Sequence, residues 1–243
     1  MPARPVKRTL IFLWSMVTVH LLTVLLASLA VIMSMAGFSG STIHRSVIRR
    51  WARWVTATSF IRVHATGLER IDPRGGPYIV VMNHQSLLDI PIVVAVLPLQ
   101  LRFIGKIELS VIPIFGAAAR RCGHIFIDRK DHEGSIDVLR EATGRIFDER
   151  ISIVVAPEGT RSPDGLLLPF KKGAFVTAIS LGVPVLPVVV RGTRDAVPKG
   201  KLGSFGGDVD VIVEEPISTA GMVYDDRDML SQQVRKMMER HLR

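Results

Sequence analysis

The segment VMNHQSLLD, at residues 81–89, decides the fold and the candidate chemistry of this chain. It follows an apolar run at 78–82 that predicts a buried strand, and it leads into residues 90–97, which predict a helix. A histidine and an aspartate, His84 and Asp89, therefore lie at a strand-to-helix junction. Ligand sites of α/β sheets commonly form at such junctions.

The spacing of His84 and Asp89 allows two interpretations. Five steps along a regular helix separate two side chains by roughly 140°, so the pair can meet only if His84 precedes the helix. Asp89 would then hold one imidazole nitrogen and leave the other free as a general base. Alternatively, Ser86 and Asp89 match a helix-start pattern in which the acid only binds backbone donors.

The composition indicates a negatively charged partner. Lys and Arg outnumber Asp and Glu by 31 to 22, which gives a net charge of +9 over 243 residues. Nucleic acid, an anionic membrane and a phosphorylated small molecule all fit that charge. A mean hydropathy of +0.32 is high for a soluble nucleic-acid binder, and the basic residues lack the interleaved aromatic residues of single-strand binders. No nucleic-acid partner is therefore expected.

The N-terminus contains a long apolar segment. Residues 10–38 are almost unbroken apolar sequence, preceded by Arg4, Lys7 and Arg8. About 20 such residues cross a bilayer, whereas a cleaved signal peptide has an apolar run of about 7–15. A retained membrane segment is therefore preferred to a signal peptide, although residues 34–36 resemble a cleavage site.

A second helical pattern follows at 41–59. Apolar residues that include Trp51 and Trp54 recur at helical spacing, while Arg49 and Arg53 fall largely on other faces. This pattern predicts an interfacial amphipathic helix, and the alternative is a basic helix packed on the domain. Because both ends of the apolar segment are basic, the positive-inside rule does not favour a simple crossing. A helical hairpin that dips into one leaflet is the preferred arrangement.

The remainder predicts a second region at 61–243, after an N-terminal region at 1–60. Strands and helices alternate, which indicates an α/β fold with a mostly parallel mixed sheet flanked by helices. Pro184 and Pro187 indicate that their strand lies at an edge or that they mark a strand end. The expected strands are 61–71, 76–83, 101–105, 124–129, 151–156, 183–190 and 208–214, and the expected helices are 90–97, 108–121, 131–148, 170–181 and 225–242.

Charged side chains follow the ends of several expected strands, and these ends converge on one rim of an open α/β sheet. A base and several cations at one rim suit an anionic substrate whose hydroxyl must lose a proton. Gly159 lets the backbone approach a ligand closely, and Arg161 provides two parallel hydrogen bonds for a phosphate. Singly, each of these residues also has a purely structural explanation, such as a surface ion pair. After His84 and Asp89, the residues concerned are Lys106, Arg129, Glu158, Gly159, Thr160 and Arg161.

Other kinds of site lack their signatures. The seven histidines are scattered and no paired cysteines occur, so a metal site is not expected. Phosphate-loop, dinucleotide-binding and serine-hydrolase motifs are also missing. The single Cys122 excludes an internal disulfide. A catalytic thiol is the alternative to a structural role for Cys122, and the structural role is preferred.

Four blocks of sequence together resemble one family. They are NHQSLLD at 83–89, GHIFIDR at 123–129, PEGTRS at 157–162 and VPVLPV at 183–188. In order and spacing they are similar to those of the bacterial 1-acylglycerol-3-phosphate acyltransferases of the glycerolipid acyltransferase superfamily. The segments KIEL at 106–109 and FKKG at 170–173 also look like family positions.

The resemblance implies a reaction and roles for the residues. His84 would take the proton of the glycerol 2-hydroxyl, and Asp89 would orient the His84 ring. The hydroxyl would then attack an acyl thioester directly. Arg129, Glu158, Gly159 and Arg161 look like the acceptor site, with the arginines on the phosphate and the glutamate near the glycerol. The co-substrate would be acyl-CoA or acyl carrier protein, without a further cofactor. Lysophosphatidic acid and membrane lipids would be the other partners, at the inner or cytoplasmic membrane with the site on the cytoplasmic side.

Two alternatives to that function remain. One is an acyltransferase with another lysolipid acceptor, because the four blocks do not separate these enzymes. The other is a membrane-docked phospholipid-binding protein without catalysis, in which the pair His84 and Asp89 would be dispensable.

Overall fold

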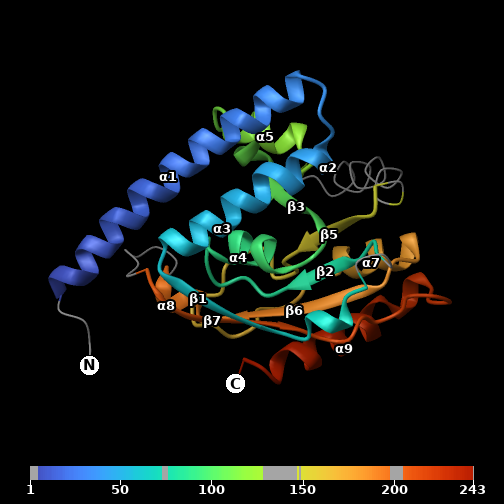
Figure 1. Ribbon diagram of the computed structural model, residues 1–243. Coiled ribbons are helices and arrows are strands. Elements are labelled where there is room, and N and C mark those ends of the chain that lie inside the picture. Colours follow the sequence, from blue (N-terminus) through green and yellow to red (C-terminus); the bar gives the residue numbers. More distant parts are fainter. Residues whose placement is uncertain (1–4, 73–75, 128–146, 148, 198–204, 243) are drawn as a thin grey trace.

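The computed structural model describes residues 5–72, 76–127, 147, 149–197 and 205–242 (Figure 1). The helices are α1 (Pro5–Met35), α2 (Gly40–Ile43), the π-helical η1 (His44–Ile48), α3 (Arg49–Thr58), α4 (Asp89–Val96), α5 (Phe115–Arg121), α7 (Gly173–Leu181), α8 (Thr193–Ala196) and α9 (Arg227–Glu239). Short 3-10 helices are η2 (Leu68–Arg70), η3 (Ile107–Val111) and η4 (Tyr224–Asp226). The strands are β1 (Ile61–Thr66), β2 (Ile79–Met82), β3 (Gln100–Lys106), β4 (Ile125–Ile127), β5 (Ile151–Val155), β6 (Val185–Arg191) and β7 (Gly207–Val213).

The described strands form one seven-stranded sheet in the order β1-β7-β6-β2-β5-β3-β4. β6 and β7 pair antiparallel, and all other neighbouring pairs are parallel. The prediction of a mostly parallel mixed sheet flanked by helices is confirmed. Because β6, β2, β5, β3 and β4 run in the same direction, their carboxyl ends share one edge.

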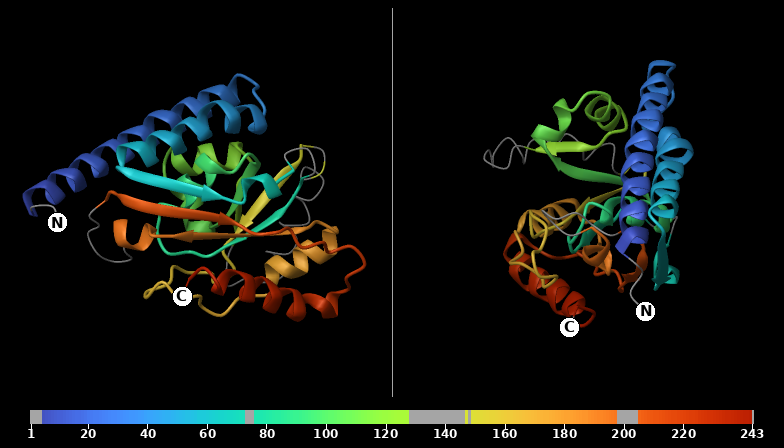
Figure 2. Two further views of the ribbon diagram at one scale, coloured as in Figure 1. Left: turned by 60° about the horizontal axis from the view of Figure 1, so that its bottom comes forward. Right: turned by 90° about the vertical axis from the view of Figure 1, so that its left-hand side faces the viewer.

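Helices cover both faces of the sheet, and the alternation of side chains along β2 shows why. Val80 and Met82 belong to the apolar core on the face covered by α3 and α4. Ile79 and Val81 belong to the core on the opposite face, under α7 and α9 (Figures 1 and 2). A strand buried on both faces has an unbroken apolar sequence, as residues 78–82 do.

α1 lies along the outside of the domain and packs against it over much of its length. Near its start, Ser15 Oγ donates to the Thr58 carbonyl at 3.1 Å. Further along, Trp51 Nε1 donates to Thr23 Oγ1 at 3.0 Å. Leu26 and Ala30 are buried in a cluster that includes residues of η1 and α5. Residues 9–35 of this helix are long and apolar enough to cross a membrane by length and composition.

α3 is packed on the domain. Ala52 and Val55 are buried in the core shared with α4. Arg49 donates to the carbonyls of Leu97 and Leu99, at 2.5 and 3.2 Å. The packed-helix interpretation of residues 41–59 is therefore confirmed for this face. Trp54 is 47% exposed, so an interfacial role for the outer face remains a prediction.

The predicted helix at 108–121 is wrong in its first half. Residues 107–111 form η3, and α5 begins only at Phe115. Between them the backbone reverses at Ile114, whose φ of 65° is outside the helical region. Pro113 occupies the turn, and proline interrupts the hydrogen-bonding ladder of a helix.

Two other expectations need correction. The strand expected at 61–71 ends at Thr66, because Gly67 has a φ of +77° and a Cβ there would lie 2.1 Å from the Val213 carbonyl oxygen. β6 is not an edge strand, since it lies between β7 and β2. Pro184 does mark the start of that strand, and Pro187 lies one residue before the pairing with β7 begins. The helix expected at 131–148 falls largely outside the described residues.

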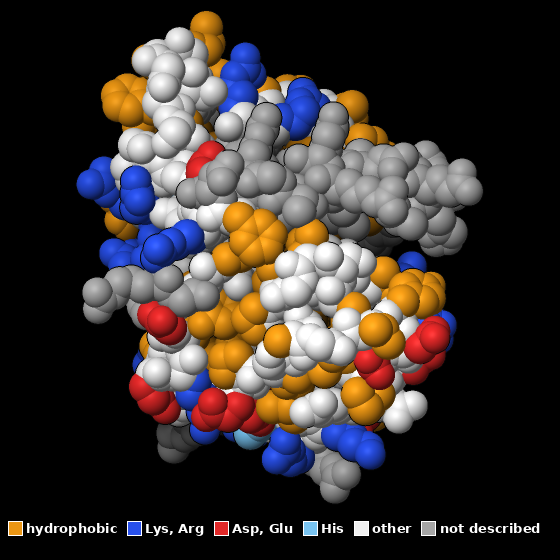
Figure 3. Space-filling model, turned by 90° about the vertical axis from the view of Figure 1, so that its right-hand side faces the viewer, with side chains coloured by type: hydrophobic (Ala, Val, Ile, Leu, Met, Phe, Trp, Pro, Cys, Tyr) orange, Lys and Arg blue, Asp and Glu red, His pale blue; other side chains and the backbone are white. Residues whose placement is uncertain are grey.

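Among the described residues, the positive charge is not gathered into one stripe on the face shown in Figure 3. Among the residues described there, Lys and Arg lie mainly toward the upper and outer edges, Asp and Glu are interspersed along the lower rim, and the centre is apolar or uncharged. A groove that follows a nucleic-acid backbone is lined by basic residues along its length. The described residues of this face do not form such a groove.

Candidate active site

His84 and Asp89 meet at the carboxyl end of β2. The His84 Nδ1 lies 2.8 Å from Asp89 Oδ2. The contact is possible because His84 lies in the loop before the helix and Asp89 is the first residue of α4. A carboxylate oxygen only accepts hydrogen bonds, so Nδ1 carries the proton and Nε2 keeps its lone pair. This is the geometry of a general base held by an acid.

Asp89 also binds the backbone of the same loop. Its Oδ2 accepts the N–H groups of Gln85 and Ser86 at 2.7 and 2.8 Å, and Asp89 has no exposed surface. The structure therefore combines the contacts of both interpretations, while the role of His84 as a base remains a prediction. Asp89 accepts hydrogen bonds from backbone N–H groups before the helix. These bonds close the loop and place the His84 ring against the Asp89 carboxylate.

The second carboxylate oxygen has a partner from a distant part of the chain. Thr193 Oγ1 donates to Asp89 Oδ1 at 2.5 Å, and both residues are fully buried. Thr193 begins α8, immediately after β6, which neighbours β2 in the sheet. Asn83, which follows β2, also binds β6. Its side-chain amide exchanges two hydrogen bonds with the backbone of Val190, at 2.8 and 2.7 Å.

The loop after β5 holds the backbone of His84. Glu158 Oε1 accepts the His84 N–H at 2.9 Å, and the Ser162 N–H donates to the His84 carbonyl at 2.8 Å. Glu158 Oε2 accepts the Leu168 N–H at 2.9 Å. Burial raises the pKa of Glu158, while these two backbone donors oppose the rise. Both of its oxygens bind backbone, so the structure gives Glu158 a positioning role; its predicted place near the glycerol remains a prediction.

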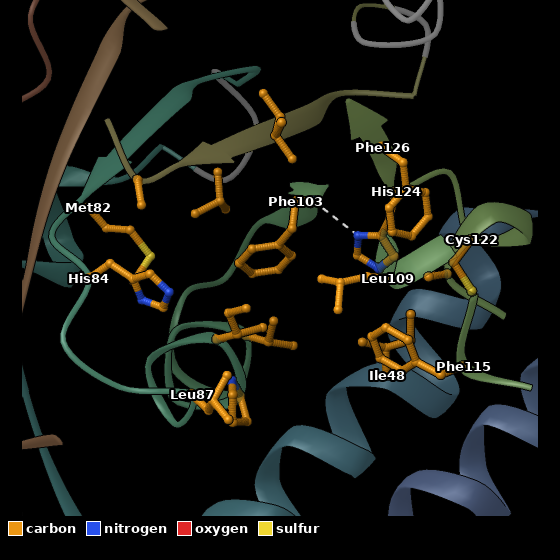
Figure 4. A pocket seen from close by; sticks show the side chains of 18 of the residues that line it. Ile48, Met82, His84, Leu87, Phe103, Leu109, Phe115, Cys122, His124 and Phe126 are labelled. Carbon is orange, nitrogen blue, oxygen red and sulfur yellow. Dashed lines mark hydrogen bonds between the residues drawn. The ribbon is translucent and has the colours of Figure 1, made fainter. Parts of the chain in front are cut away.

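A large apolar cavity of about 1410 Å³ opens beside His84 (Figure 4). Figure 4 shows His84 and Met82 at one end, Phe103 in the middle, and Leu109 and Phe115 toward the other end. Side chains of α1, α3 and α4 also line it, among them Leu26, Trp51 and Val94. A proton acceptor at the wall of an apolar cavity suits a reactive group attached to a long hydrocarbon chain.

Positive groups gather beside the β5 loop. Gly159 lines the cavity with a φ of 70°, and a Cβ there would lie 3.0 Å from Lys171 Cε. Lys171 and Lys172 also line the cavity, together with Gly173 at the start of α7. A helix N-terminus and adjacent lysines favour an anion. Lys172 also forms an ion pair with Asp228, whose carboxylate lies 2.7 Å from the Lys172 Nζ.

The predicted substrate residues divide into three groups. Glu158 and Gly159 lie with His84, as the convergence of strand ends predicted. Lys106 is exposed at the end of β3 and is not among the residues that line the cavity, whereas Thr160 and Arg161 continue the β5 loop. Arg129 lies outside the described residues, so its role remains a prediction. Within the described part of the chain, no cluster of His, Cys, Asp or Glu has the form of a metal site.

Cys122 lines the far part of the cavity but is not poised as a nucleophile. It is buried, and burial raises the pKa of its thiol to about 11, which outweighs the lowering by Arg102. A thiol that stays protonated is a poor nucleophile.

The acyltransferase family model matches residues 62–191, more than half of the chain. The chain belongs to the acyltransferase family. That span includes His84, Asp89 and the β5 loop, and it ends at the last residue of β6.

Named relatives agree with this assignment. The human 1-acyl-sn-glycerol-3-phosphate acyltransferase alpha is 38% identical over 73% of this chain and 62% of its own length. The Saccharomyces cerevisiae 1-acyl-sn-glycerol-3-phosphate acyltransferase is 31% identical over 88% of this chain and 75% of its own length. A chloroplastic relative from Brassica napus, 37% identical over 75% of this chain, is matched over only 53% of its length. The chain thus spans about half to two thirds of the length of several relatives.

A solved structure extends the likeness to nearly the whole chain. The crystal structure of the 1-acyl-sn-glycerophosphate (LPA) acyltransferase PlsC from Thermotoga maritima superposes with a TM-score of 0.81 at 30% identity. The match covers 98% of this chain and 95% of that one. The likeness therefore includes the N-terminal helices, which lie outside the residues matched by the family model.

Thr193 was not predicted at the site, whereas Lys171 was predicted only as part of the FKKG segment at 170–173, without a role of its own. Thr193 carries no signature, because it is a single threonine beyond a strand. The only available signal for Thr193 was topological. It follows a strand whose end reaches the rim with His84, but the order of strands in the sheet is needed to place it there.

Proposed function

We propose that this chain transfers a fatty acyl group from an acyl thioester to the 2-hydroxyl of 1-acylglycerol-3-phosphate, which gives phosphatidic acid. The observation that carries the proposal is the hydrogen bond from His84 Nδ1 to Asp89 at the wall of a cavity of about 1410 Å³. Relatives that bear the name of this activity, and the matched PlsC structure, support the choice of substrate.

In the proposed mechanism, His84 Nε2 accepts the proton of the acceptor hydroxyl as its oxygen attacks the thioester carbonyl. Asp89 stabilises the imidazolium that results. The tetrahedral intermediate then collapses, the carbon–sulfur bond breaks, and the departing thiolate takes the proton from His84. No acyl-enzyme forms, which is consistent with the protonated state of the buried Cys122. The apolar cavity would hold hydrocarbon chain, because it is lined mainly by apolar side chains.

The acceptor phosphate would bind beside the β5 loop. Gly159 gives the backbone close access, and Lys171 and the start of α7 add positive charge at the same wall. Arg161 would contribute paired hydrogen bonds to the phosphate. Lys106 and Arg129 are retained in the proposal as further cations of the acceptor site.

The N-terminal helices would lie in one leaflet of the membrane. α1 contacts the domain near Ser15, near Thr23 and near Ala30. A helix held along its length by the domain cannot cross the bilayer without carrying that domain into it. Its other face exposes large apolar side chains such as Leu21 and Ile32, at 65% and 62%. We infer a helix parallel to the inner or cytoplasmic membrane, with the site on the cytoplasmic side where thioester donors are found.

The test is an assay of the purified full-length chain in detergent with lysophosphatidic acid and either acyl-CoA or acyl carrier protein thioester. The expected result is thiol release coupled to phosphatidic acid formation. If another lysolipid is acylated while lysophosphatidic acid is left unreacted, the acceptor is that lysolipid and not lysophosphatidic acid. Lipid binding without thiol release under any of these conditions would favour the non-catalytic alternative and overturn the proposal.

A further inference from the structure

The segment between β3 and α5 is an exposed apolar loop. It comprises residues 107–114, with η3 at its start and the turn at Pro113 at its end. Val111 is 77% exposed, which is among the highest values for a large apolar side chain in the described residues. The other exposed aliphatic side chains of this loop are Ile107 at 43%, Leu109 at 40%, Ile112 at 43% and Ile114 at 41%.

The backbone of this loop forms a tight turn at its end and is tied to α5. Ile114 has φ 65° and ψ −56°, and the Phe115 N–H donates to the Pro113 carbonyl at 2.6 Å. A β-branched residue in this tight turn is strained. Arg120 ties the loop to α5 by donating to the Ser110 carbonyl at 2.5 Å. Gly116 is packed against the loop, since a Cβ would lie 2.0 Å from the Ser110 carbonyl oxygen.

The loop borders the cavity and leads directly into α5, which packs against α1. Leu109, Ile112 and Phe115 line the same cavity as His84. α5, which directly follows the loop, packs against Leu26 and Ala30 in the last third of α1. Figure 1 shows this part of the chain emerging beside α1, and Figure 4 shows Leu109 and Phe115 at the end of the cavity away from His84.

Charge at the two ends of the loop favours a lipid surface. Lys106 precedes it, and Arg120 and Arg121 end α5, all three exposed. Glu108 is the one acidic residue within the loop. Apolar side chains flanked by basic ones are typical of segments that enter the headgroup region of an anionic membrane.

We propose that residues 107–114 form a second membrane-inserting element, which enters the same leaflet as α1 and borders the route by which a lipid chain reaches the cavity. This proposal deepens the proposed function. The identity of the lipid that reaches the cavity past this loop rests on that function. Insertion is supported by the exposed apolar side chains of the loop, by the basic residues that flank it, and by the packing of α5 against α1 directly after it. A second copy of the chain is the competing occupant of this surface.

The first experiment locates the loop relative to the membrane. An environment-sensitive fluorophore is attached at Val111→Cys in a Cys122→Ser background, and the full-length protein is reconstituted into vesicles of phosphatidylcholine and phosphatidylglycerol. The matched control is Val223→Cys, a valine that is 62% exposed before η4 and far along the chain from the loop. Nitroxide groups on the lipid acyl chains should quench the probe at position 111 at least several-fold more than at 223.

Two results would overturn the proposal. One is equal quenching at positions 111 and 223. The other is a blue shift at 111 that appears without vesicles and grows with protein concentration, which would assign the surface to a second copy. Because no turnover is needed, a quenched probe on an inactive protein would contradict the proposed function alone.

The second experiment measures the consequence for catalysis. Val111→Glu should lower the rate on long-chain acceptor in vesicles by about tenfold, the size expected when one aliphatic side chain is kept out of lipid. The rate on a short-chain, water-soluble acceptor should not change, because Val111 does not line the cavity. Val111→Leu should behave as the wild type, and Val223→Glu is the charge control. Equal losses on both acceptors, or no loss on either, would contradict the proposal.

Discussion

Two histidines, His84 and His124, line the same cavity and differ in what holds their rings. His84 Nδ1 faces a carboxylate, so it carries the proton and leaves Nε2 as an acceptor. His124 Nδ1 accepts the Phe103 N–H at 3.0 Å, so its proton lies on Nε2. The partner of Nδ1, rather than the presence of an imidazole in the cavity, therefore decides which ring is a base.

The electrostatic surroundings of His124 reinforce the difference. Burial, followed by the positive charge of Arg102, lowers the pKa of His124 to about 3. The ring is neutral at physiological pH and has little tendency to accept a proton. His44, whose Nε2 accepts the Leu101 N–H at 3.3 Å, is a similar case, with its pKa lowered to about 2 by burial and by nearby arginines.

Exchanging the two rings for other side chains should give the largest contrast. His84→Ala should lower kcat by about 10²–10⁴-fold, the usual contribution of a positioned general base. His124→Asn keeps an acceptor for the Phe103 N–H and should retain activity within a few-fold. Steady-state assays of both purified variants measure the contrast. Similar losses in the two variants would show that the partner of Nδ1 does not distinguish them.

Removing the hydrogen bond from Thr193 to Asp89 should lower kcat less than removing the His84 ring does. Thr193→Val removes the hydroxyl that donates to Asp89 Oδ1 and should lower kcat by about tenfold, within the range of a hydrogen bond to a charged group. The KM values for both substrates should change little, because Thr193 reaches the substrate only through Asp89 and His84. Thr193→Ser should restore most of the rate. A variant with full kcat and reduced melting temperature would limit Thr193 to a structural role.

The pH dependence of the free energy of unfolding should show whether the fold holds His124 neutral. Its folded pKa of about 3 lies below its ordinary value of 6.5, so the unfolded chain binds the proton more tightly. The stability it contributes is complete above 6.5 and is lost as pH falls toward 3, by about 1.4 kcal/mol per pH unit. His124→Asn should flatten the fall between pH 6.5 and 5 by roughly that slope.

Urea unfolding of wild type and His124→Asn in detergent at several pH values measures this slope. Comparison of the two proteins is required, because Glu158 acts in the opposite direction. Its raised pKa makes its contribution grow as pH falls toward the ordinary value of 4.5. Parallel pH profiles in the two proteins would mean that His124 is not held neutral by the fold.

The smallest effect is expected at Cys122. Its thiol is buried with a pKa raised to about 11, and direct transfer to the acceptor needs no thiol. Cys122→Ser should therefore keep near-normal kcat. An acyl group trapped on the wild-type protein, and absent from this variant, would contradict direct transfer.

The sequence predicted the sheet and part of the site for a physical reason. Parallel strands place their carboxyl ends at one edge, so His84 after β2 and Glu158 after β5 had to lie near each other once these strands were neighbours. The loop position of His84 followed from the roughly 140° that five helical steps would impose. These predictions depend on local pattern and on a general rule of sheet geometry.

Other features depended on contacts that no local pattern encodes. Thr193 reaches Asp89 only because β6 pairs with β2, across 104 positions of the chain. Glu158 was predicted near the glycerol, while both of its oxygens bind backbone N–H groups. The exposed loop at 107–114 was hidden in the predicted helix at 108–121, and the close approach of Gly116 to the Ser110 carbonyl, which holds the loop against α5, is a contact that local sequence does not show.

The most direct test of the central claim is the tautomer of His84 in the resting protein. Histidine ring nitrogens labelled with ¹⁵N distinguish protonated from unprotonated sites by NMR, and spectra of His84→Ala and His124→Asn assign the two rings. The account predicts a proton on Nδ1 of His84 with Nε2 unprotonated near neutral pH, and the opposite tautomer for His124. A proton on Nε2 of neutral His84 would leave that ring without a free acceptor and would contradict its role as the base.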